Sequence, residues 1–178
     1  MKGVIIYKSK YGSTRQYAEW LHGETGFDLF DVRQSPPDFQ QYDTLIIGSS
    51  VFAGRLALAN WIRQHWPSLC GKTVLVMMVN ITADQNMVAN FVPQSLPGEI
   101  ADHLKVFPVG GRYSLQQMSF FDRTMIKMVA SLEKRQEVKQ ELLAERDWVN
   151  KDNLQALLDE IHRLPVGTDS RTSTVSDT

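Results

Sequence analysis

The sequence contains a single cysteine, Cys70, among 178 residues, so no disulfide can form within the chain. Because disulfides persist mainly in oxidising compartments, this composition leads us to expect a cytoplasmic protein. Cys70 precedes Gly71 at an expected helix-to-strand turn. We expect its side chain to be buried or half-buried and structural rather than reactive.

Long apolar runs and an excess of one charge are also missing. The longest apolar stretches, such as residues 73–79, are far too short to cross a bilayer, and no apolar signal-peptide core follows Lys2. The formal net charge of −1 provides no strong field for nucleic acid or for an anionic membrane. We therefore expect no nucleic-acid partner and at most peripheral association with a membrane, and a homo-oligomer remains open.

Two common nucleotide motifs are absent as well. The loop at residues 9–14, which follows the first apolar run, has no G-K-[ST] lysine and no G-x-G-x-x-G, so neither a P-loop nor a dinucleotide fingerprint is present there. None of the four histidines is spaced as a metal ligand, and no Ser-His-Asp set follows from residue order. We expect no metal site, and we assign no catalytic residue.

What is present is a globular composition, with 43% hydrophobic and 22% charged residues. Residues 1–164 are expected to form one domain, and the Ser/Thr/Asp-rich residues 165–178 a disordered tail. Apolar runs predict strands at 3–7, 27–32, 43–48, 72–80 and 104–109. Helical patterns occupy 56–66, ended by Pro67, then a short segment at 98–103, then 119–144 and 150–164. This alternation predicts an α/β fold with a doubly wound, mainly parallel sheet.

The loop after the first strand is the strongest functional signal. It reads Ser9-Lys10-Tyr11-Gly12-Ser13-Thr14, and Ser13 or Thr14 can cap the helix that follows. Hydroxyls and amides that face a helix N-terminus favour a phosphate, although the same residues are ordinary in turns. A small phosphate held by neutral hydrogen bonds makes flavin mononucleotide (FMN) the obvious candidate.

Two further loops would meet the first one at the point where strand order reverses. The loop at residues 48–55 follows the third strand, and its small residues permit close approach of a planar ring on which Phe52 could stack. Asn80-Ile81-Thr82 follows the fourth strand and offers amides and a hydroxyl to the other edge of that ring. Three such loops that meet at one edge of the sheet are a far more specific signal of a binding site than any one of them.

These residues resemble the FMN-binding loops of flavodoxin-like proteins, chiefly through Ser9 to Thr14, Ile47-Gly48-Ser49-Ser50 and Val79-Asn80. Gly110-Gly111-Arg112-Tyr113, Phe120 to Lys127 and Asp147-Trp148 are similar to the menaquinone-dependent protoporphyrinogen oxidase branch. The resemblance implies a three-layer fold with a five-stranded parallel sheet in the order 2-1-3-4-5.

It also implies that the first loop surrounds the FMN phosphate and that the later loops surround the flavin ring. The candidate cofactor-binding residues are Ser9, Lys10, Tyr11, Gly12, Ser13, Thr14, Ser49, Ser50, Val51, Phe52, Ala53, Gly54, Asn80, Ile81, Thr82, Gly111 and Arg112.

The chain departs from the oxidase pattern in two places. The segment Ser114 to Met118 is neutral where the oxidases are rich in arginine, and residues 134–146 are helical and rich in glutamate. Because arginine binds propionates best, a porphyrinogen substrate is less favoured. Arg123 and Lys127 are read as an i,i+4 pair on an exposed helix face rather than as substrate ligands.

Three functions remain as hypotheses. The first is an FMN-dependent oxidoreductase of the protoporphyrinogen-oxidase-like branch, which passes electrons from a small-molecule substrate to a quinone. The second is a flavodoxin-type electron carrier that docks on a redox partner protein, and the third is a partner-binding module that has lost its flavin. Residues 112–121 either cover the flavin edge or pack onto the sheet through Leu115, Met118 and Phe121.

Overall fold

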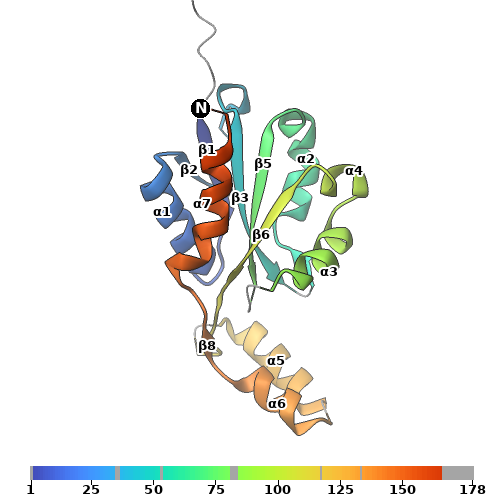
Figure 1. Ribbon diagram of the computed structural model, residues 1–178. Coiled ribbons are helices and arrows are strands. Elements are labelled where there is room, and N and C mark those ends of the chain that lie inside the picture. Colours follow the sequence, from blue (N-terminus) through green and yellow to red (C-terminus); the bar gives the residue numbers. More distant parts are fainter. Residues whose placement is uncertain are drawn as a thin grey trace, which may run out of the picture.

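The computed structural model describes residues 2–34, 37–52, 54–80, 84–116, 118–132 and 134–165. Its central sheet contains the five predicted parallel strands, in the order β2-β1-β3-β5-β6 (Figure 1). Their bounds are β1 Gly3–Lys8, β2 Asp28–Asp31, β3 Thr44–Phe52, β5 Thr73–Asn80 and β6 Lys105–Gly110. Counted along the parallel strands alone, this is the order 2-1-3-4-5, and the predicted fold class is confirmed.

Helices cover both faces of the sheet (Figure 1). One face packs against α1 (Ser13–Thr25) and α7 (Gln155–Arg163), through side chains such as Tyr17, Leu21 and Leu157. The other face packs against α2 (Ala59–Leu69), α3 (Asn86–Ser95) and α4 (Gly98–Ala101). Burial on both faces explains why the strands read as continuous apolar runs in the sequence.

A helical pair projects beyond the carboxyl ends of the strands, outside the three layers (Figure 1). It consists of α5 (Phe120–Leu132) and α6 (Gln136–Leu143). The chain enters it through β7 (Arg112–Tyr113) and leaves it through β8 (Arg146–Asp147), and these two short strands pair antiparallel. This pairing brings together the two ends of the segment at residues 112–147, which we call the excursion, beside β6. In place of the predicted continuous helix at 119–144, the structure has two helices, of which the first ends at Leu132 and the second begins at Gln136.

The third strand is longer than predicted. Ser49 to Phe52 were expected in a loop, but they continue β3, which then turns at Gly54 and pairs antiparallel with β4 (Arg55–Leu56). Gly54 has a φ of 75°, a conformation that glycine adopts without steric cost. The predicted loop is therefore a β-hairpin at the end of the third strand.

Several predicted helix boundaries were wrong. Pro67 was expected to end the second helix, but α2 continues to Leu69, because the fully buried Leu69 side chain offsets the single hydrogen bond that proline removes. The segment before β6 holds α3, with Pro93 inside it, in addition to α4. The last helical segment begins as a 3₁₀ turn, η2 (Lys151–Leu154), and another 3₁₀ turn, η1 (Phe39–Gln41), precedes β3.

Cys70 is exposed, contrary to the prediction, because Leu69 takes the buried position at the end of α2. The expected tail lies outside the described residues from residue 166 onward. Within the described ranges, no helix combines the length and hydrophobicity needed to cross a membrane, and no cluster of side chains is suited to a metal ion.

Candidate functional site

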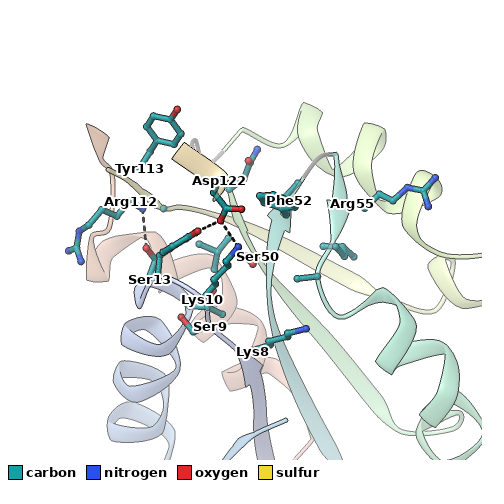
Figure 2. Close-up of a pocket in the computed structure, with 18 of the residues that line it drawn as sticks. Lys8, Ser9, Lys10, Ser13, Ser50, Phe52, Arg55, Arg112, Tyr113 and Asp122 are labelled. Atoms are coloured by element: carbon teal, nitrogen blue, oxygen red, sulfur yellow. Dashed lines mark hydrogen bonds and ion pairs between the residues drawn. The ribbon is translucent and has the colours of Figure 1, made fainter. Parts of the chain in front are cut away.

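A pocket of about 660 Å³ lies at the carboxyl ends of the central strands (Figure 2). This volume is typical of a site for a small molecule or cofactor, which ranges over roughly 300–1,000 Å³. All three predicted loops contribute to it. The candidate residues that line it are Ser9, Lys10, Tyr11, Ser13, Thr14, Ser50, Val51, Phe52, Gly54, Asn80, Gly111 and Arg112.

Five other candidates are placed differently. Gly12 and Ser49 do not belong to the pocket lining. The Ser49 side chain is fully buried, where its hydroxyl donates to the Ser50 carbonyl and accepts from the Leu58 N–H at 3.1 Å. Ser49 thus anchors the start of α2. Ala53, Ile81 and Thr82 lie outside the described residues.

The first loop presents hydrogen-bond donors to the pocket. Gly12, with a φ of 93°, is the N-cap of α1, and no side chain caps this helix. The prediction that Ser13 or Thr14 caps it was wrong, because both lie inside the first turn. The first helical backbone bond runs from the Gln16 N–H to the Gly12 carbonyl at 2.9 Å, so the amides of the first turn have no partner within the helix.

Two serine hydroxyls near this turn are used as acceptors. Ser9 Oγ accepts from the Gly12 N–H at 3.0 Å, and Ser13 Oγ accepts from the Arg112 N–H at 3.1 Å. A hydroxyl that accepts still carries its own proton to donate. The loop therefore has both amide and hydroxyl donors for an anion.

A carboxylate from the excursion reaches this same loop. Asp122, near the start of α5, accepts hydrogen bonds from Lys10 Nζ and from the Tyr11 hydroxyl (Figure 2). The Asp122 residue is only 5% exposed, and the bonds from Lys10 and Tyr11 lower the pKa of its carboxyl. Asp122 falls within the segment Phe120 to Lys127, but no local pattern marks it as a site residue, since its partners lie more than a hundred positions away.

The opposite wall is apolar. Phe52 is 50% exposed at the end of β3, and its ring centroid lies 5.4 Å from Lys10 Nζ. Leu56 and Phe91 continue this wall. A planar apolar group therefore finds an aromatic surface on the side that faces the polar first loop.

The excursion covers one side of the pocket through Met118, Met125 and Ile126. Phe121 was expected either to cover a ligand or to pack onto the sheet, yet it is 73% exposed and does not line the pocket. Packing of Phe121 onto the sheet is therefore excluded, while Met118 lies on the ligand side.

Arg123 and Lys127 do not form the predicted exposed pair. Lys127 is exposed, but Arg123 is half-buried, and its Nη2 donates to the carbonyl oxygens of Gln116 and Met118. The guanidinium thus fixes the chain where it enters α5. Arg112 lines the pocket, but its side chain points away (Figure 2) and donates to Asp147 at 2.7 Å.

Comparison with known families agrees with the fold of the central sheet. Residues 4–140 match the family described as Flavodoxin domain. The chain belongs to the flavodoxin-domain family. In this flavodoxin domain the matched region extends through α5 into α6, so it includes α5, which covers one side of the pocket. No curated protein matches the chain significantly.

Solved structures similar to this flavodoxin domain include a flavoprotein in complex with FMN from Lactobacillus acidophilus. It is 21% identical over 61% of this chain and 91% of its own, with a TM-score of 0.47. A flavodoxin from the domain Archaea is 14% identical over 70% of this chain and 90% of its own, with a TM-score of 0.42. The Trp repressor binding protein from Bacillus subtilis is 12% identical over 62% of this chain and 84% of its own, with a TM-score of 0.45.

Proposed function

We propose that this flavodoxin domain binds FMN in the pocket and acts as an oxidoreductase that passes electrons from an organic substrate to a quinone. The observation that carries the proposal is the division of one pocket into two parts. The first loop and the start of α1 supply donors for an anion, while the β3–β4 hairpin and α5 supply apolar walls.

The hydrogen-bond donors of the first loop suit a phosphate group at the end of an uncharged part of the ligand. The donors all belong to one short stretch of chain: the amides of the first turn of α1, which have no partner within the helix, the Ser9 and Ser13 hydroxyls and the Lys10 ammonium. Amides at a helix N-terminus favour a phosphate through both their geometry and the helix dipole. We assign the FMN phosphate to this stretch.

The remaining pocket suits the flavin ring, which supplies hydride and electron transfer when bound. Phe52 offers it an aromatic face on one side. On the other side, Gly111 allows the backbone to pack closely on β5, because a Cβ atom at this position would meet the Asn80 carbonyl oxygen at 2.9 Å. We assign the ring to the space between these two segments.

The cover over the pocket favours a small reaction partner. Met118, Met125 and Ile126 present an apolar surface from α5 and the segment that precedes it, which suits a planar quinone. A carrier that exchanges electrons only with proteins needs no such cover.

We propose more specifically that the electron donor is a porphyrinogen. Because a porphyrinogen carries negatively charged propionates, its binding requires cations in the pocket. Arg112 pairs with Asp147, and Lys10 pairs with Asp122. Arg55 and Lys8 line the pocket, are exposed, and form no ion pair within the part of the chain that the structure describes. These two cations are our candidates for the propionates.

The first experiment is the absorbance spectrum of the purified protein. Yellow protein that releases FMN on denaturation supports the proposal, and protein that neither contains nor takes up FMN overturns it. The second experiment is anaerobic reduction followed by mixing with a soluble quinone. Rapid reoxidation with saturation in quinone concentration is expected, whereas a reduced protein that reoxidises only with a protein acceptor indicates an electron carrier.

A matched pair of variants locates the quinone. Met125→Gln places an amide in the pocket cover, and Met128→Gln makes the same change on α5 at an exposed position that does not line the pocket. We expect Met125→Gln to lower kcat/KM for the quinone by about tenfold, as for other changes in apolar specificity pockets, with Met128→Gln unchanged. Equal effects of both variants would contradict the assignment of α5 as the cover.

A further inference from the structure

The contact of Asp122 with Lys10 and Tyr11 has a consequence for the cofactor. Both donors belong to the first loop, and both donate to one carboxylate of α5, which Figure 2 shows beside Lys10. A phosphate on this loop and the Asp122 carboxylate are both anions, and each is stabilised by the same donors. Two anions that share one set of donors in a partly buried site repel each other.

We propose that the Asp122 carboxylate competes with the FMN phosphate for Lys10 and Tyr11, so that binding of the cofactor releases α5 from the first loop. The inference rests on the proposed binding of FMN. It makes Asp122 a positioning residue: its carboxylate sets where α5 lies, and it lowers the affinity of the pocket for a phosphate-bearing flavin.

The position of α5 in the fold permits such a movement. The helix lies outside the three layers and beside α6 (Figure 1). Several of its large apolar side chains are exposed, among them Phe120 at 84% and Leu132 at 75%. Helices that bury little apolar surface against a core shift at small energetic cost, so a single ion pair to the first loop can decide the position of this one.

The charges around Asp122 define the competition. The Lys10 ammonium donates to the carboxylate and lies 5.3 Å from the Tyr11 ring centroid and 5.4 Å from that of Phe52. Lys10 therefore spans the pocket from the first loop toward the β3–β4 hairpin. On the side of α5, the Asp122 N–H donates to Ser119 Oγ at 3.2 Å, which fixes the carboxylate at the beginning of the helix.

Release of α5 would change access to the pocket. Met125 and Ile126 follow Asp122 by three and four positions, so they lie on the same side of α5 and line the pocket from there. A shift at Asp122 moves these two side chains with it. Cofactor binding and entry of the second substrate are coupled in this way through one carboxylate.

Hydrogen exchange tests the inference without any substitution. Exchange of the backbone amides in residues 118–126 is measured for the wild-type protein alone, with FMN, and with riboflavin, which has the same ring but no phosphate. We expect FMN to accelerate exchange in this segment and riboflavin to leave it unchanged. Slower exchange with FMN, or equal effects of both flavins, would overturn the inference.

The variant Asp122→Asn removes the charge and keeps the shape. We expect it to bind FMN about tenfold more tightly than wild type, within the roughly 5–150-fold range typical of coupled sites. Its amides in residues 118–126 should exchange rapidly with or without FMN. Asp102→Asn makes the same change at an exposed position just after α4 and should behave as wild type.

The outcomes separate this inference from the proposed function. Loss of FMN binding in wild type and variant alike, measured by quenching of flavin fluorescence, overturns the proposed function. Unchanged or weaker FMN binding by Asp122→Asn, with wild type binding FMN, overturns only the competition by Asp122. A circular dichroism spectrum identical to that of wild type establishes that the variant is folded.

Discussion

The hydroxyl of Tyr17 in α1 donates a hydrogen bond of 2.6 Å to the carbonyl oxygen of Gly110 at the end of β6. The same hydroxyl accepts hydrogen bonds from Asn153 Nδ2 at 2.7 Å and from the Asn150 N–H at 3.2 Å. The residue is fully buried. This one oxygen therefore joins the helix behind the first loop to the strand end that enters the excursion, and it holds two walls of the pocket in register.

Tyr17→Phe removes this oxygen and leaves buried polar partners unsatisfied. We expect the free energy of unfolding to fall by about 1–3 kcal/mol, measured by urea denaturation. Because Asn153 acts through the same oxygen, the double variant with Asn153→Ala should cost less than the sum of the two single variants. Additive costs would contradict the network.

The hydroxyl of Thr14 is expected to donate to the FMN phosphate. Thr14→Val keeps the shape of the side chain but removes the hydroxyl, whereas Thr14→Ser keeps the hydroxyl. A hydrogen bond to a charged group contributes about 1.5–3 kcal/mol, so Thr14→Val should weaken FMN binding by roughly ten- to a hundredfold. A fluorescence titration in which both variants bind equally tightly would remove Thr14 from the site.

Gly111 is expected to tolerate no side chain. Its N–H donates to the Asn80 carbonyl oxygen at 2.5 Å, and an added Cβ would come within 2.9 Å of the same oxygen. Gly111→Ala should therefore destabilise the fold by about 1–3 kcal/mol through overpacking. Gly23→Ala is the matched control, since Gly23 is helical with nothing near an added Cβ, and it should stabilise the fold by about 0.5–1 kcal/mol. Denaturant unfolding of both variants measures the difference.

The stability of the fold should decrease at high pH through Tyr42. Burial and the 2.8 Å hydrogen bond that the Tyr42 hydroxyl donates to Asp28 raise the pKa of Tyr42 to about 12. Since the folded-state pKa lies above the unfolded value near 10, this contribution is complete below pH 10 and is lost as the pH rises toward 12. Tyr42→Phe should flatten the decline in stability within this window. An identical pH profile for variant and wild type would show that Tyr42 does not titrate there.

Much of the site could be predicted because its signals are local. The loop from Ser9 to Thr14 follows an apolar run with the length and β-branching of a buried strand, and parallel strands bring their carboxyl-end loops to one edge. The hairpin at the end of β3 and Asn80 at the end of β5 reach the pocket for the same reason. Their exact conformations could not be predicted: Ser49 lies in β3, paired with Lys8 of β1 and Met78 of β5, and its hydroxyl bonds to backbone groups.

The sequence by itself predicted the five strands and the edge at which a ligand site forms, because apolar periodicity and strand-end loops are recognised within a few residues. The order of the strands was implied by the resemblance to flavodoxin-like proteins. Only the tertiary structure decided that α3 continues past Pro93, that Cys70 is exposed and that Asp122 meets Lys10 and Tyr11. Each of these depends on which side chains gain burial or a charged partner from distant parts of the chain. Such contacts cannot be predicted from local sequence, since they form only when separate elements pack together.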